Sequence, residues 1–92
     1  MLNVEKIGLR NMGTVNKNMV FISGKDEKGN NRNITLYFSY ETIVGIEKDY
    51  NTYCLQNYWS TTTGKLLNEI ESDKSKRLSQ EDFDKVLNSI FN

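Results

Sequence analysis

The sequence contains no histidine and no proline, and it has a single cysteine, Cys54. Without imidazole, the usual Ser–His and Cys–His nucleophile pairs and most zinc sites are excluded. One cysteine allows no disulfide within the chain, although a secreted chain of 92 residues would often need one. Cys54 stands in an alternating, strand-like segment, and we interpret it as a small core residue rather than as a nucleophile.

Net charge is also missing, because 12 Lys and Arg balance 12 Asp and Glu. A domain dedicated to duplex nucleic acid usually carries a basic excess, so this balance does not favour that class. No apolar run approaches the ~20 residues of a membrane span. The N-terminus lacks the basic-then-apolar pattern of a signal peptide. We therefore expect a cytoplasmic protein with no membrane partner.

The length suits one domain spanning 1–92, since two separate cores would each be too small to be stable. Its first half indicates strands. An apolar run at 19–22 is followed by a polar turn and by period-two alternation at 34–38. Segments 42–47 and 52–58 have further strand character, and residues 1–10 could add an edge strand. Every connection is too short for a crossover helix, which predicts an antiparallel meander.

After Trp59 the spacing of apolar residues changes to that of helices, over 62–71 and 79–91. Ser79 is the expected N-cap of the second helix. The predicted fold class is therefore α+β, with an antiparallel β-meander of about four strands followed by two C-terminal α-helices packed on one face. The expected core consists of Phe21, Ile34, Leu36, Phe38, Val44, Ile46, Leu55, Leu66, Leu67, Ile70, Phe83, Val86, Leu87 and Ile90.

No catalytic constellation is recognisable. The acidic groups at 69–73 and 81–84 lie in or beside the predicted helices, where carboxylates are ordinary solvated surface. Thr63-Gly64-Lys65 resembles the end of a phosphate-binding loop, but the motif requires a glycine four residues before the Gly-Lys pair and Ser or Thr after it. Trp59 and Leu66 occupy those positions. We expect no catalytic residue, metal site or cofactor, and so no enzyme.

Two segments are candidate binding sites. At the predicted strand–helix corner, Trp59, Thr62, Lys65 and Asn68 could form a site with free backbone N–H groups for an anion. The same residues could instead define the corner structurally, with Trp59 in the core and the threonines capping the helix. The basic run of Lys74, Lys76 and Arg77 could contact phosphates or an acidic partner, or could be a solvated connector.

Three segments of the sequence resemble a family of small uncharacterised domains. They are the string from Trp59 to Asn68, the segment from Asp73 to Leu78, and Phe38–Thr42. The resemblance covers roughly residues 33–91 and rests on a Trp-x-x-Thr-Thr-Gly-Lys-x-Leu-Asn pattern. It implies an origin in phages, plasmids or other mobile elements, and hence a bacterial host cell. It implies no biochemical activity, and no catalytic residue can be transferred.

These features favour a non-enzymatic interaction protein that binds a host or phage macromolecule, in the first place a protein. Inhibition of a host defence protein is one form that this function could take. The alternative is a nucleic-acid-binding module, with sheet tyrosines stacking on bases and Lys65, Lys74, Lys76 and Arg77 facing phosphates. A four-stranded sheet covered on one face leaves the other bare, which predicts a homodimer.

Overall fold

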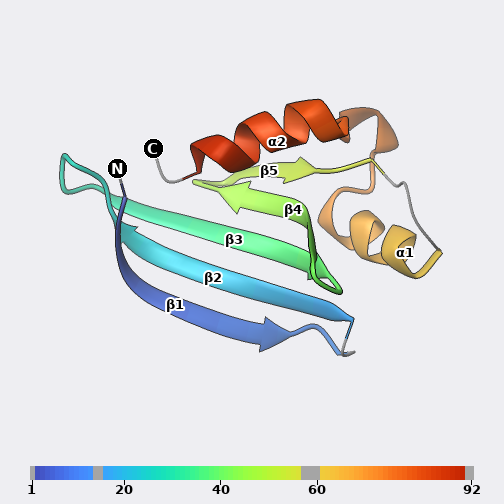
Figure 1. Ribbon diagram of the computed structural model, residues 1–92, viewed down its shortest axis with the longest axis horizontal. Coiled ribbons are helices and arrows are strands. Elements are labelled where there is room, and N and C mark those ends of the chain that lie inside the picture. The colour runs from blue at the N-terminus through green and yellow to red at the C-terminus, as the bar shows by residue number, and fades with distance from the viewer. Residues whose placement is uncertain (1, 14–15, 57–60, 91–92) are drawn as a thin grey trace.

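The fold was taken from a computed structural model, which describes residues 2–13, 16–56 and 61–90, with backbone only for 61–64. One antiparallel sheet holds five strands in chain order, and two α-helices follow it (Figure 1). This confirms the α+β class and the order of elements. The strands are β1 (Asn3–Asn11), β2 (Lys17–Lys25), β3 (Asn31–Ser39), β4 (Thr42–Lys48) and β5 (Asn51–Cys54).

The predicted count of about four strands was one too low, because residues 3–11 form a full edge strand paired with β2. This confirms the edge strand considered for residues 1–10, although Val4, Ile7 and Leu9 do not alternate with a period of two. The register shifts between Val4 and Lys6, so Glu5 is the extra residue of a β-bulge. The bulge returns Val4 to the same face of the sheet as Ile7 and Leu9, since these three lie opposite Gly24, Ile22 and Val20.

The helices are α1 (Thr61–Ile70) and α2 (Gln80–Ser89), with a single 3₁₀ turn, η1 (Lys74–Lys76), between them. The predicted N-cap of α2 is confirmed: the Ser79 hydroxyl accepts a hydrogen bond from the backbone N–H of Asp82 at 3.3 Å. Asp73 caps η1 in the same way by accepting from the N–H of Ser75. A short polar side chain therefore caps the first turn of both α2 and η1.

Alternation along the strands defines two faces of the sheet. Face A carries Ile22, Ile34 and Ile46, and face B carries Phe21, Tyr37 and Gly45. Phe83 and Ile90 of α2 pack with the isoleucines of face A.

On face B, Leu66 and Leu67 of α1 pack with Val44 and Cys54. A Cβ added to Gly45 would lie 2.9 Å from Cδ1 of Ile70, so α1 rests directly on the bare backbone of β4.

The two helices therefore cover opposite faces of the sheet, with β5 between them (Figure 1). The prediction that both pack on one face is wrong. The run Ile43-Val44-Gly45-Ile46 is apolar without alternation, which is the pattern of a strand buried on both sides. Only the β4–β5 end is covered in this way, and β1 to β3 extend beyond the helices.

Most of the predicted core is confirmed, and nine of its fourteen residues are buried. Phe38, Ile70, Val86 and Leu87 are partly buried at its margin. Phe21 is the exception, because it lies on face B and its neighbour Ile22 occupies the core position instead. In a strand, a shift of one residue exchanges the two faces, and the short run 19–22 contains no polar residue that would fix the choice.

Candidate functional site

The structure separates the predicted corner residues. Trp59 lies outside the described residues, and Thr62 is described only as part of the backbone of α1. Lys65 and Asn68 are both exposed on α1. Lys65 precedes Glu69 by one turn, and Glu69 forms an ion pair with Lys17 of β2 at 3.6 Å. Lys65 thus lies on the side of α1 that faces the open part of the sheet.

The basic run also divides into two parts. Lys74 and Lys76 are exposed in η1, whereas Arg77 is buried. Nη2 of Arg77 donates to Oδ1 of Asn68 at 2.6 Å, and Nε and Nη2 donate to the carbonyl of Glu71 at 3.2 and 3.1 Å. Arg77 therefore satisfies a carbonyl just beyond the C-terminus of α1, where positive charge is favourable. This pairing gives Arg77 and Asn68 a structural role.

Cys54 is buried under α1, which confirms its interpretation as a core residue. Its Sγ lies 3.9 Å from the carbonyl oxygen of Leu67. Burial raises the pKa of the thiol to about 11. Since the thiolate is the reactive form, Cys54 is unsuited to nucleophilic attack at neutral pH.

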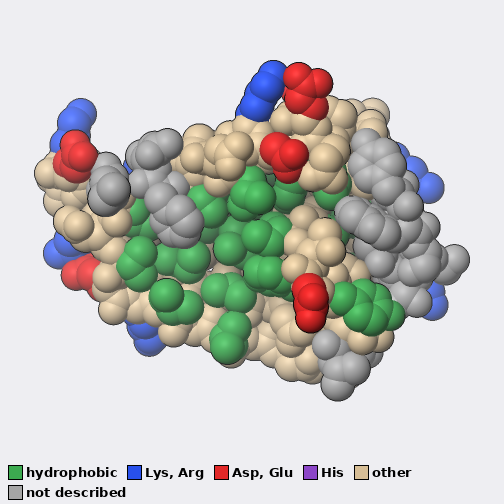
Figure 2. Space-filling view, viewed as in Figure 1, with side chains coloured by type: hydrophobic (Ala, Val, Ile, Leu, Met, Phe, Trp, Pro, Cys, Tyr) green, Lys and Arg blue, Asp and Glu red, His purple; other side chains and the backbone are tan. Residues whose placement is uncertain are grey.

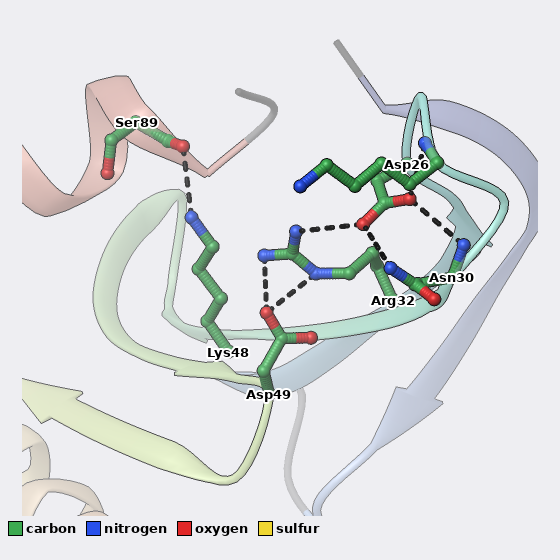
Figure 3. A network of polar contacts seen from close by, with 7 residues as sticks. Asp26, Asn30, Arg32, Lys48, Asp49 and Ser89 are labelled. Carbon is green, nitrogen blue, oxygen red and sulfur yellow. Dashed lines mark hydrogen bonds and ion pairs between the residues drawn. The ribbon is translucent and has the colours of Figure 1, made fainter.

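A polar network joins the β2–β3 and β4–β5 turns (Figure 3). Arg32 donates from Nε to Oδ2 of Asp49 at 2.8 Å and also pairs with that carboxylate through Nη2. Its Nη1 lies 3.8 Å from Oδ2 of Asp26. The other oxygen of that carboxylate, Oδ1, accepts hydrogen bonds from the backbone N–H groups of Lys28 and Asn30 at 2.9 Å each.

These contacts lower two carboxyl pKa values. The hydrogen bond from Arg32 lowers the pKa of Asp49, and the backbone N–H of Asn30 contributes most to lowering that of Asp26. Nearby, Lys48 extends along face A, and its Nζ donates to the carbonyl of Ser89 at 3.1 Å. The network therefore holds two turns together and ties the end of β4 to α2.

Beside this network, a polar pocket of about 410 Å³ opens on face B. Asn33, Thr35 and Glu47 line it, together with Tyr50 of the β4–β5 turn. Tyr50 is 96% exposed, and Asp49 and Tyr50 have φ values of 48° and 72°. A two-residue hairpin turn requires this left-handed backbone, which Asn and Gly adopt far more readily than Tyr. Tyr50 thus presents its ring to solvent from a strained position.

Exposed apolar side chains gather on face A. Val4, Ile7 and Leu9 of β1 are 46, 63 and 80% exposed. They adjoin a half-buried apolar row formed by Val20, Phe38 and Ile43. Figure 2 shows apolar side chains gathered over the sheet between α2 and β1, with Lys and Arg at the rim. This surface, the open part of face A, was not foreseen from the sequence, because the irregular spacing in β1 concealed it.

A five-stranded antiparallel meander covered on opposite faces at one end by two helices defines a small α+β domain. The chain belongs to a family of unknown function (DUF8033), whose sequence profile matches residues 4–85. The match begins earlier and ends sooner than the resemblance noted over 33–91, and it includes β1. No curated protein and no solved structure matches the chain. No helix in the described part of the chain is long and apolar enough to cross a membrane.

Proposed function

We propose that this chain is a non-enzymatic binding protein that holds a partner protein against the open part of face A. One observation carries the proposal: the apolar side chains of β1 share a face with the core yet extend beyond the cover of α2. Single exposed apolar residues are common, but a contiguous apolar patch on a monomer usually marks an interaction surface.

The edge of the sheet adds a second means of attachment. Among the strands that the structure describes, β1 is an edge strand paired with β2 alone, so its outer side offers backbone N–H and C=O groups to an incoming strand. A partner strand added there would bring its own alternate side chains over Ile7 and Leu9. Main-chain hydrogen bonds and apolar burial would then act together.

The alternative set of nucleic-acid contacts has less support. Arg77 is engaged with Asn68 and Glu71 inside the fold. Tyr53 packs on face A against the core, and the Tyr37 hydroxyl donates to Glu47 at 3.3 Å on face B. Within the described part of the chain, Tyr37, Tyr53 and Arg77 therefore do not combine into one stacking surface.

The resemblance noted in the sequence supports a mobile-element origin and a host protein as partner, a defence protein being one instance. The single cysteine supports a cytoplasmic location. The homodimer expected from the sequence used a sheet face left bare by both helices, whereas α1 and α2 cover opposite faces. Self-association is proposed here through the open part of face A instead. It would bury the same side chains as a foreign partner, so one variant tests both.

The test compares the wild type with an Ile7→Ser, Leu9→Ser variant and with Lys85→Ser, a control on the exposed side of α2. We expect affinity purification from host lysate to recover a protein that the double variant loses and the control retains. Sedimentation at 100 μM identifies the partner as a second copy if the wild type is a dimer and the double variant a monomer. A monomeric wild type that recovers no partner, or a partner retained equally by both variants, would contradict the proposal.

A further inference from the structure

The charges of β1 and β2 are segregated between the two faces. These strands carry four cations, and the register places Lys6, Arg10, Lys17 and Lys25 all on face B. Glu5, the bulge residue, is the only carboxylate on either strand. Lys17 pairs with Glu69 of α1, so Lys6, Arg10 and Lys25 make face B of these two strands basic in a chain with no net charge. No residue that the register places on face A of the same strands is charged.

The aromatic ring of Phe21 lies between two of these cations. Phe21 is half-buried and stands directly opposite Gly8, which is midway between Lys6 and Arg10 on β1. A Cβ at Gly8 would lie 4.0 Å from both Cβ and Cδ2 of Phe21, so the ring flanks a strip of bare backbone. At the β-strand rise, the two cations are roughly 13 Å apart along β1. One ring is therefore bracketed by two positive charges.

The adjacent strand continues this surface. Tyr37 on β3 is also half-buried on face B, diagonal to Phe21 and roughly 7–8 Å away in such a sheet. Asn33 and Thr35 lie on the same face at the polar pocket. Neither side chain has a hydrogen-bond partner among the described residues, so both can serve a ligand.

We propose that this surface of face B, formed by Lys6, Arg10, Phe21 and Tyr37, binds single-stranded nucleic acid. Lys6 and Arg10 contact phosphates, and Phe21 stacks on a base. Charge complementarity selects a polyanion, and the ring between the cations selects one that carries planar groups. In a duplex the bases are stacked on one another, so they could not lie on a flat sheet. This activity goes beyond the proposed protein binding, because it uses the opposite face of the same strands.

The experiment is fluorescence anisotropy with a labelled 12-nucleotide DNA or RNA strand at 50 and 200 mM KCl. Contacts to two or three phosphates predict that affinity falls about 7- to 18-fold between these salts. Lys6→Gln and Arg10→Gln should each weaken binding and reduce the slope of log K against log[salt] by about 0.7. Phe21→Leu should weaken binding at least about fivefold, whereas Phe21→Tyr, which keeps the ring, should bind normally.

Controls separate this activity from others. Lys74→Gln removes an exposed cation outside face B and should leave binding unchanged. Leu9→Ser alters only face A and should also leave nucleic-acid binding unchanged. A failure of the proposed protein binding can therefore be told apart from a failure of nucleic-acid binding. Thermal unfolding confirms that each variant is folded. The assignment would be overturned if the wild type does not bind the strand at 50 mM KCl, or if it binds duplex as tightly as the single strand. It would also be overturned if the protein binds heparin and Phe21→Leu binds the single strand as tightly as the wild type does.

Discussion

Replacement of Gly24 by alanine tests how β1 is attached to the sheet. Gly24 is buried on face A, where the start of β1 passes over it. A Cβ at this position would lie 2.9 Å from the carbonyl carbon of Asn3, and the carbonyl oxygen would be closer still. Because the obstruction is backbone, no rotamer change can relieve it. The first residues of β1 must move away.

The magnitude follows from what that movement breaks. The pairs Asn3–Lys25 and Val4–Gly24 would be lost, together with part of the packing of Leu2 on the core. At about 0.5–1.5 kcal/mol for each backbone hydrogen bond, and less the entropy gain of Gly→Ala in the unfolded chain, the net loss is about 2 kcal/mol. For a domain of this size that lowers Tm by about 8–16 °C.

Gly8→Ala provides the matched control, since it lies in the same strand pair. Its Cβ would meet only Phe21, at an ordinary contact distance of 4.0 Å. This substitution should leave Tm unchanged or raise it slightly. Thermal unfolding by circular dichroism measures both variants, and hydrogen exchange locates the change to the amides of residues 3–6. A Gly24→Ala protein that melts within 2 °C of the wild type would refute the reasoning.

Three other outcomes are expected. Asn68→Ala should destabilise the fold by about 1–2 kcal/mol in urea denaturation, because Arg77 loses a charge-assisted bond, while Lys65→Ala should have no effect; equal effects would contradict the structural role. The Cys54 thiol should react with a thiol reagent only after denaturation, so rapid labelling of the native protein would be inconsistent with its burial. The lowered pKa of Asp49 contributes stability that is complete above its unfolded value of about 3.9 and is lost as pH falls through the folded value; Asp49→Asn should reduce this acid sensitivity of the urea midpoint.

Much of the fold could be predicted because its sequence signals are local. Alternation at Ile34, Leu36 and Phe38 and helical spacing from Phe83 to Ile90 both gave the correct elements. What could not be predicted from the sequence is which face of the sheet each side chain and each helix occupies. The faces of the run 19–22 and of the run 43–46 depend on where the helices dock, and no single segment encodes that.

The candidate sites were harder to predict for a related reason. A basic residue has the same sequence signal whether it binds a partner or a carbonyl, so Arg77 was indistinguishable from Lys74 and Lys76. The two open surfaces were missed because each combines side chains of several strands, and no single segment shows which of these side chains the register brings onto one face. The bulge at Glu5 in particular breaks the alternation along β1, so the edge strand could be considered from the sequence but the common face of Val4, Ile7 and Leu9 could not.

The order of the strands affects how a newly made chain reaches its fold. Each strand pairs with its predecessor across a connection of two to five residues, so the sheet can form by successive local closures. The cover of face A comes last, when α2 returns Phe83 and Ile90 to Ile22 and Ile34. On a ribosome the sheet is complete in sequence before α2 is synthesised. During that interval the whole apolar face is open to chaperones, to other nascent chains and to aggregation.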